Sequence, residues 1–222
     1  MDFHRLIKSL DALVYEVLSW LLFYPMTIWW MLRQPVKTML AVERELKEDA
    51  EHSFDDMIGP PLFLALTIGL LHLFDPADLV ETTSGISDTA AGFLADEKNL
   101  VGARIILFGT LPLLAALWMV GARGERASMS SLRAPVYAAC YPTAIFAFLF
   151  TVANHLTNRH EALAALEGVG ILLAGIGWWM LVVSLWYRAE LKIAWWRALL
   201  RTGALLVSWV VLLTVVGFLL GA

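Results

Sequence analysis

The sequence predicts an all-α polytopic membrane protein, and three observations carry this prediction. Hydrophobic residues make up 59% of the 222 residues and charged residues only 16%, whereas a soluble domain of this length carries roughly 25% charged residues. The mean hydropathy is +0.70. The apolar residues gather in stretches of about 18–26 residues, long enough for a helix to cross ~30 Å of hydrocarbon.

Five apolar stretches are expected to cross the membrane as helices, because a helix pairs its backbone polar groups internally, as lipid requires. The stretches are residues 57–74, 101–120, 134–156, 166–187 and 195–220. The first one opens with Gly59-Pro60-Pro61, and prolines at a helix start cost little since those amide groups lack intrahelical partners. We therefore expect a five-helix membrane bundle over residues 57–222.

The preceding segment, residues 1–56, is expected to lie on the cytoplasmic face. In residues 1–34, apolar residues recur at three- and four-residue steps among charges, which is typical of an amphipathic helix. Residues 17–32 are continuously apolar, but about 16 residues with Pro25 in the middle are short for a crossing that needs about 20. We expect an interfacial or half-inserted helix here, with a sixth crossing as the alternative. Residues 33–56 are polar and predict a surface helix outside the bilayer.

The basic residues predict the orientation, because Lys and Arg concentrate in cytoplasmic loops. With five crossings, all of the 16 Lys and Arg residues except Lys98, Arg104 and Arg159 fall on one side. A sixth crossing moves only Arg5 and Lys8. The sequence therefore predicts an integral protein of the bacterial inner membrane with a cytoplasmic N-terminus.

Cations interleaved with aromatic residues gather at the predicted cytoplasmic ends of the spans. Each cation near anionic lipid contributes about 1 kcal/mol, and Trp and Tyr favour the headgroup region. Their position at a membrane boundary favours lipid or a protein partner over nucleic acid. The candidate residues for these contacts are Arg123, Arg126, Arg133, Arg188, Lys192, Arg197 and Arg201.

Four segments also carry a family resemblance. They are RQPVKTML before the spans, PPLFLALTIGLLHLF at the first span, GARGERASMSSLRAPVYAACYP before the third, and RAELKIAWWRALLR between the last two. In this layout, over most of residues 25–221, the chain resembles the Yip1 family of five-span membrane proteins. The resemblance implies a membrane-embedded, partner-binding protein without established catalytic residues.

The end of the first span holds the candidate intramembrane polar site, His72 and Asp75, because ionisable residues in a span are functional candidates. The competing interpretation is an interfacial anchor, since His72 lies within one turn of the span's end. A long acidic connection follows over residues 75–100, and we expect it to be partly ordered on the membrane surface.

Small residues on one face of the fourth span predict close helix packing, within the bundle or across a dimer. A pore or substrate groove is the alternative interpretation. The residues are Gly170, Ala174, Gly177 and Ser184.

The sequence predicts neither a metal site nor a cofactor site. His155 and His160 do not complete a ligand set by themselves. The acidic group of His52, Asp55 and Asp56 is more typical of a solvated helix end. The single cysteine, Cys140, lies in an apolar context that favours a buried structural thiol.

These patterns favour a non-catalytic integral membrane protein that acts through lipid or partner contacts, as a Yip1-like scaffold or accessory subunit. We expect membrane lipids and either a second copy or another membrane protein as its partners. A small transporter or channel is the alternative, with a polar set of Thr67, His72, Thr110, Thr143, Thr151, Asn154 and Ser184. A lipid-modifying enzyme is the third hypothesis, and it requires convergence of His52, Asp55, Asp56, His72 and Asp75.

Overall fold

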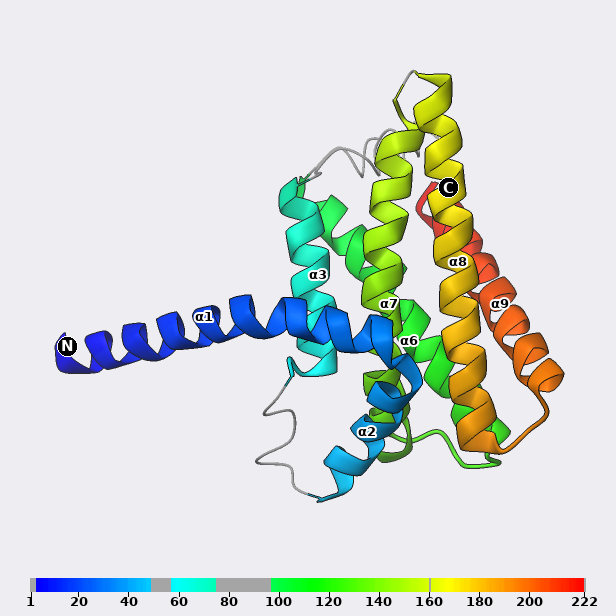
Figure 1. Cartoon of the computed structure of the whole chain (residues 1–222), viewed down its shortest axis with the longest axis horizontal. Coiled ribbons are helices and arrows are strands. Elements are labelled where there is room, and N and C mark those ends of the chain that lie inside the picture. The colour runs from blue at the N-terminus through cyan, green and yellow to red at the C-terminus, as the bar shows by residue number, and fades with distance from the viewer. Residues whose placement is uncertain (1–2, 49–56, 75–96, 160, 222) are drawn as a thin grey trace.

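The computed structural model describes residues 3–48, 57–74, 97–159 and 161–221, and all regular structure in them is helical (Figure 1). This confirms the all-α class. The helices are α1 (Phe3–Arg33), α2 (Pro35–Glu48), α3 (Pro60–Phe74), α6 (Glu97–Ala122), α7 (Met129–Thr157), α8 (Ala162–Leu191) and α9 (Trp195–Gly221).

Four of these helices, α6 to α9, are long and apolar enough to cross a membrane, which supports an integral membrane bundle. The first predicted span is shorter than expected: α3 starts at Pro60 and has 15 residues, about 22 Å at 1.5 Å per residue. The other four predicted spans each lie within a slightly longer helix. In particular, α6 starts at Glu97, so the end of the predicted 75–100 connection is helical, while residues 75–96 lie outside the described residues.

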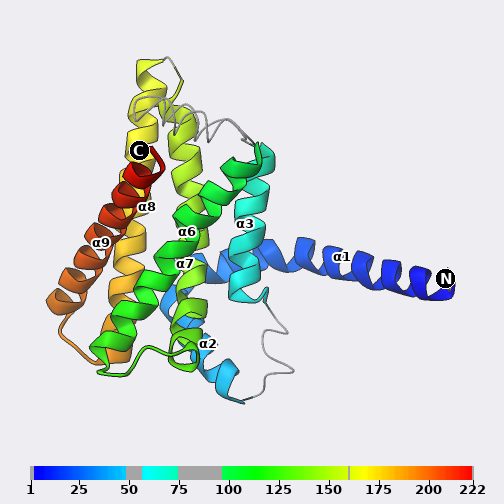
Figure 2. The same ribbon diagram turned by 180° about the vertical axis from the view of Figure 1, so that it is seen from behind.

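Helix α7 is the centre of the bundle and contacts α1, α2, α3, α6 and α8 (Figures 1 and 2). Ser128 starts it with a capping box, in which the Ser128 and Ser131 side chains each bond the other residue's backbone N–H. Pro135 and Pro142 lie inside the helix without ending it. Buried alanines such as Ala144 give its neighbours close access to its backbone.

Successive helices from α3 to α9 alternate in direction, as the colours in Figures 1 and 2 show. As a result, α6 and α8 end where α7 and α9 begin. We call this the basic end of the bundle, defined by residues 123–133 and 188–201, and α2 lies at the same end (Figure 1). The seven candidate cations therefore share one end of the molecule.

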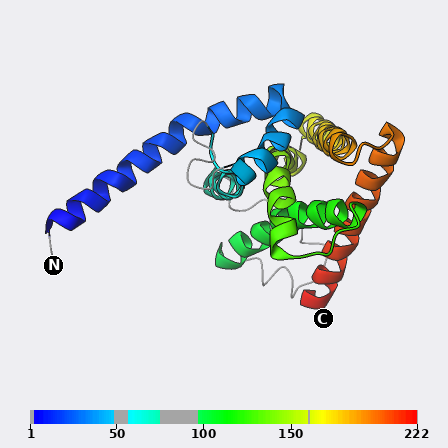
Figure 3. The ribbon, with the colours of Figure 1, turned by 90° about the horizontal axis from the view of Figure 1, so that it is seen from below.

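Helix α1 runs across the bundle rather than along it, and its N-terminal half extends away from the other helices (Figures 1 and 3). Over residues 14–22 most of its apolar side chains are exposed, with Tyr15 at 76% and Leu21 at 74% exposure. Residues 17–32 continue in the same helix, which is not among the helices long and apolar enough to span.

Aromatic rings hold the four long helices together. Phe146 of α7 lies 6.2 Å from Trp179 of α8 and 6.3 Å from Trp209 of α9, measured between ring centroids. Phe108 of α6 lies 5.7 Å from Phe150. Because such ring pairs contribute about 0.5–1.5 kcal/mol beyond their buried area, this cluster makes α6 to α9 the stable core.

The close-packed face of α8 is not the predicted one. Gly170 and Gly177 are exposed, and a Cβ atom at either would meet nothing within 4 Å. A Cβ atom at Gly168 would instead lie 2.6 Å from the Ala153 carbonyl oxygen and also collide with the Thr157 hydroxyl. Gly170 and Gly177 therefore do not pack against another helix of the same chain, because Gly170, two positions after Gly168, points to a different side of α8.

The other two predicted packing residues, Ala174 and Ser184, differ from each other in burial. Ala174 is exposed, whereas Ser184 is buried and its hydroxyl donates to Thr202 Oγ1 of α9 at 3.0 Å. Gly175, next to Ala174, packs on α7, where its Cβ would lie 3.2 Å from Leu149 Cβ. Packing of the exposed small residues against a second chain stays a prediction.

The two glycine faces of α8 make a matched test. We expect Gly168→Ala to lower the free energy of unfolding by about 1–3 kcal/mol, the usual cost of overpacking. Gly170→Ala adds its methyl group to open space, so its effect stays within about 0.5 kcal/mol or is stabilising. Thermal unfolding in detergent, followed by circular dichroism, measures both, and equal midpoints for the two variants would contradict this packing.

Candidate functional site

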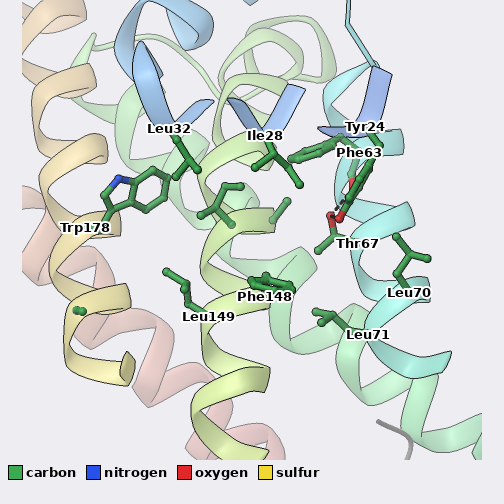
Figure 4. Close-up of a pocket in the computed structure, with 13 residues that line it drawn as sticks. Tyr24, Ile28, Leu32, Phe63, Thr67, Leu70, Leu71, Phe148, Leu149 and Trp178 are labelled. Carbon is green, nitrogen blue, oxygen red and sulfur yellow. Dashed lines mark hydrogen bonds between the residues drawn. The ribbon is translucent and has the colours of Figure 1, made fainter. Parts of the chain in front are cut away.

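An apolar groove of about 650 Å³ lies between α1, α3, α7 and α8 (Figure 4). Its volume falls in the range of about 300–1,000 Å³ typical of small-molecule sites. The lining residues are Tyr24, Ile28, Leu32, Phe63, Thr67, Leu70, Leu71, Ala144, Ile145, Phe148, Leu149, Ala174 and Trp178. Several of them are also surface residues, including Leu32 and Phe148 at 52% and 51% exposure, so the groove is open to its surroundings.

Ile58 links α1 to α7 just before the start of α3, beside the groove. The backbone N–H of Ile58, just before α3, donates to Thr27 Oγ1 of α1 at 3.2 Å. The Ile58 carbonyl accepts from the Tyr141 hydroxyl of α7 at 2.9 Å. We call these two bonds the Ile58 junction. All three residues are buried, so the junction fixes α1 as one wall of the groove.

Two described lining residues, Tyr24 and Thr67, form a hydrogen-bonded polar pair, and the donor of their bond can be inferred. The Thr67 hydroxyl donates to the Phe63 carbonyl at 2.8 Å, because a carbonyl only accepts. The Tyr24 hydroxyl lies 3.0 Å from Thr67 Oγ1 (Figure 4). Since the Thr67 hydrogen is already used, the Tyr24 hydroxyl is the donor of this bond.

Burial raises the pKa of the Tyr24 phenol, and the side-chain contact with Thr67 lowers this pKa without cancelling the effect of burial. Because the ordinary pKa of tyrosine is already about 10, the phenol keeps its proton at neutral pH.

Among the residues that the structure describes, the groove lining contains no Asp, Glu, Lys, Arg or His. It therefore offers neither an acid–base pair nor a partner for a charged ligand. The indole of Trp178 presents its six-membered ring toward the groove, and its nitrogen lies on the α8 side (Figure 4). What the groove can do chemically is hold an apolar molecule.

At the basic end, Arg123 is engaged within the chain. Its Nη2 atom lies 2.8 Å from Glu190 Oε2, and both side chains are mostly buried at 18% and 16% exposure. This ion pair ties the α6–α7 connection to the end of α8. By contrast, Arg126, Arg188 and Lys192 are exposed.

The remaining predicted cations sit beside aromatic or apolar groups. Arg133 lies 5.7 Å from the centre of the Tyr137 ring and Arg197 lies 5.1 Å from that of Trp196, in the range of cation–π contacts. Arg201 is half-buried and lines a furrow of about 550 Å³ between α6 and α9. These contacts suit a boundary between lipid and water.

Of the predicted ionisable sites of the first span and its flanks, the structure describes only His72. His72 is half-buried on the last turn of α3 and is not among the lining residues. His52, Asp55, Asp56, Asp75 and His160 lie outside the described residues. Within the described ranges, no three His, Cys, Asp or Glu side chains converge as metal ligands. Cys140 is buried.

The polar set of the transporter hypothesis does not surround a shared space in the groove. Thr67 lines it, but the other members of the set do not. The hydroxyls of Thr110 and Thr143 each donate to the carbonyl four residues earlier in their own helix, Ile106 and Ala139, at 2.8 Å. Such internal bonds satisfy a hydroxyl without a ligand.

The sequence interpretation named two of the groove residues, Thr67 and Ala174, but for other roles, and it did not predict the groove. The available signal is Thr67 itself, a polar residue in an apolar stretch. It indicates that the hydroxyl has a polar partner, but not which residue that partner is. Its partner Tyr24 is 43 residues away, and no local pattern relates the two.

Comparison with models of protein families, with curated proteins and with solved structures returned no match for this chain. The resemblance to the Yip1 family therefore stays a prediction.

Proposed function

We propose that this chain is a non-catalytic integral membrane protein that acts by binding lipid. The apolar groove between α1, α3, α7 and α8 is the observation that carries the proposal. The resemblance to the Yip1 family suggests the role of a scaffold or accessory subunit, and we place this role in the bacterial inner membrane.

The lining of the groove supports hydrocarbon as its occupant. Surface residues such as Leu70 and Phe148 belong to the lining, so the space communicates with whatever surrounds the bundle. In a membrane these surroundings are acyl chains. An apolar groove without charged groups gains nothing from an ion or a water-soluble metabolite, but it packs well against methylene groups.

The depth of α1 supports the same proposal. The Ile58 junction holds α1 at the level of Tyr141, which is eight residues, or about 12 Å, along α7 from the cation Arg133. This depth is close to the acyl boundary, where amphipathic helices bury their apolar faces about 5–10 Å deep. The exposed Leu18, Leu21 and Leu22 then contact lipid rather than water.

Five crossings are part of the proposal. Although α3 is short, it runs beside α7 in the same direction, away from the end where α2 lies (Figure 1). A crossing at α3 keeps α2 and the basic end on one side, which is the cytoplasmic side by the positive-inside rule. The N-terminus is then cytoplasmic.

A contact with a second copy or another membrane protein is compatible with this role. The exposed small residues Gly170, Ala174 and Gly177 give α8 an open face of the kind that lets helices approach closely.

Filling the groove tests the lipid role. Ala174 lines the groove, whereas its neighbour Leu173 is 64% exposed and does not. In nanodiscs with a photoreactive acyl chain, we expect Ala174→Trp to reduce crosslinking to groove peptides about tenfold, which corresponds to about 1.4 kcal/mol. Leu173→Trp leaves it unchanged. Wild-type protein without groove crosslinks, or equal labelling of the two variants, would remove the proposal.

Cysteine labelling tests the five crossings. In a Cys140→Ala background, exposed Lys37, Arg126 and Arg159 are replaced singly by cysteine and treated with a membrane-impermeant thiol reagent. We expect Arg159→Cys to react from outside intact cells, and Lys37→Cys and Arg126→Cys only after permeabilisation. If Lys37→Cys reacts together with Arg159→Cys, α3 does not cross and four crossings are correct.

A further inference from the structure

We propose that the groove takes a neutral lipid with a free hydroxyl, of the class of fatty alcohols, prenols and diacylglycerols, and that this hydroxyl donates to the phenol oxygen of Tyr24. The inference rests on the proposed lipid role and narrows its ligand.

The direction of the hydrogen bonds made by Tyr24 and Thr67 determines which polar group of a ligand can bind there. Thr67 donates to the Phe63 carbonyl and accepts from Tyr24. The Tyr24 hydrogen is thus used, while its oxygen still has lone pairs. A ligand at this point gains a hydrogen bond by donating. A hydroxyl satisfies that requirement, but an ester or ether oxygen, which only accepts, does not.

The absence of charge from the lining selects a neutral lipid. A phosphate group drawn into the groove would find no Lys, Arg or His among the lining residues, and burying an unpaired ion costs far more than burying a hydroxyl. The seven candidate cations of the basic end are not among the lining residues, and Arg123 is already paired with Glu190. Charged headgroups therefore favour the basic end, and a neutral alcohol favours the groove.

The position of the pair also fits a lipid alcohol. The Tyr24 ring lies 5.1 Å from the Phe63 ring, a contact that holds the phenol in place before a ligand arrives. Tyr24 belongs to α1, near the proposed acyl boundary, while Leu70, Leu71 and Phe148 line the groove farther from α1 (Figure 4). A hydroxyl at Tyr24 thus places its hydrocarbon chain along α3 and α7.

A matched pair of ligands tests the inference in the full-length protein. Oleyl alcohol and oleyl methyl ether share one chain, but only the alcohol donates. Each competes against the photoreactive acyl probe in nanodiscs. We expect the wild-type protein to prefer the alcohol about fivefold, a ratio typical of one net hydrogen bond. Tyr24→Phe should weaken binding of the alcohol, so that the alcohol and the ether compete equally well. The control variant Tyr15→Phe, on the exposed part of α1, should keep the preference for the alcohol.

Thr67→Val gives a different signature. It frees the Tyr24 hydrogen, so the ether gains a donor and should bind better than it does to the wild-type protein. Equal binding of alcohol and ether to the wild-type protein, or a preference that survives Tyr24→Phe, would overturn the inference and leave lipid occupancy standing. If neither ligand competes and the probe does not label the groove, the lipid role falls as well.

Discussion

The two hydrogen bonds of the Ile58 junction link α1, the start of α3 and α7, and with the Tyr24–Thr67 bond they hold α1 beside the groove. Ile58 precedes α3, so its backbone groups lack partners within that helix, and in hydrocarbon each unsatisfied group costs several kcal/mol. Thr27 and Tyr141 supply the two partners at 3.2 and 2.9 Å. Because α3 is short and α1 extends beyond the bundle, this junction locates both, and the groove depends on it for one of its walls.

The rest of the bundle is held together without α1. The aromatic cluster around Phe146 joins α6 to α9, and the Tyr187 hydroxyl of α8 donates to the Ala115 carbonyl of α6 at 2.7 Å. The molecule thus combines a tightly packed four-helix core with an N-terminal part attached along α7. A ligand groove at such a boundary needs no loss of core packing, which explains how an otherwise close-packed bundle includes an open apolar space.

Hydropathy and charge predicted the helical class, the long helices and the gathering of Arg123 to Arg201 at one end, because burial in lipid and the positive-inside rule act on local composition. They did not predict which face of a helix packs. Gly168 and Gly170 are equivalent by composition, yet only the first meets α7. The groove depends on pairs such as Thr27 with Ile58 and Tyr24 with Thr67, 31 and 43 residues apart, and tertiary geometry alone brings these together.

We propose above all that α1 lies along the membrane plane in the inner leaflet and forms one wall of the groove. Spin labels placed singly over residues 14–22 in nanodiscs measure it, through the accessibility of each label to oxygen and to a water-soluble nickel complex. The account predicts a depth that oscillates every 3.6 residues about a constant mean near the acyl boundary. A depth that changes steadily along the segment, or labels that are all in water, would contradict it.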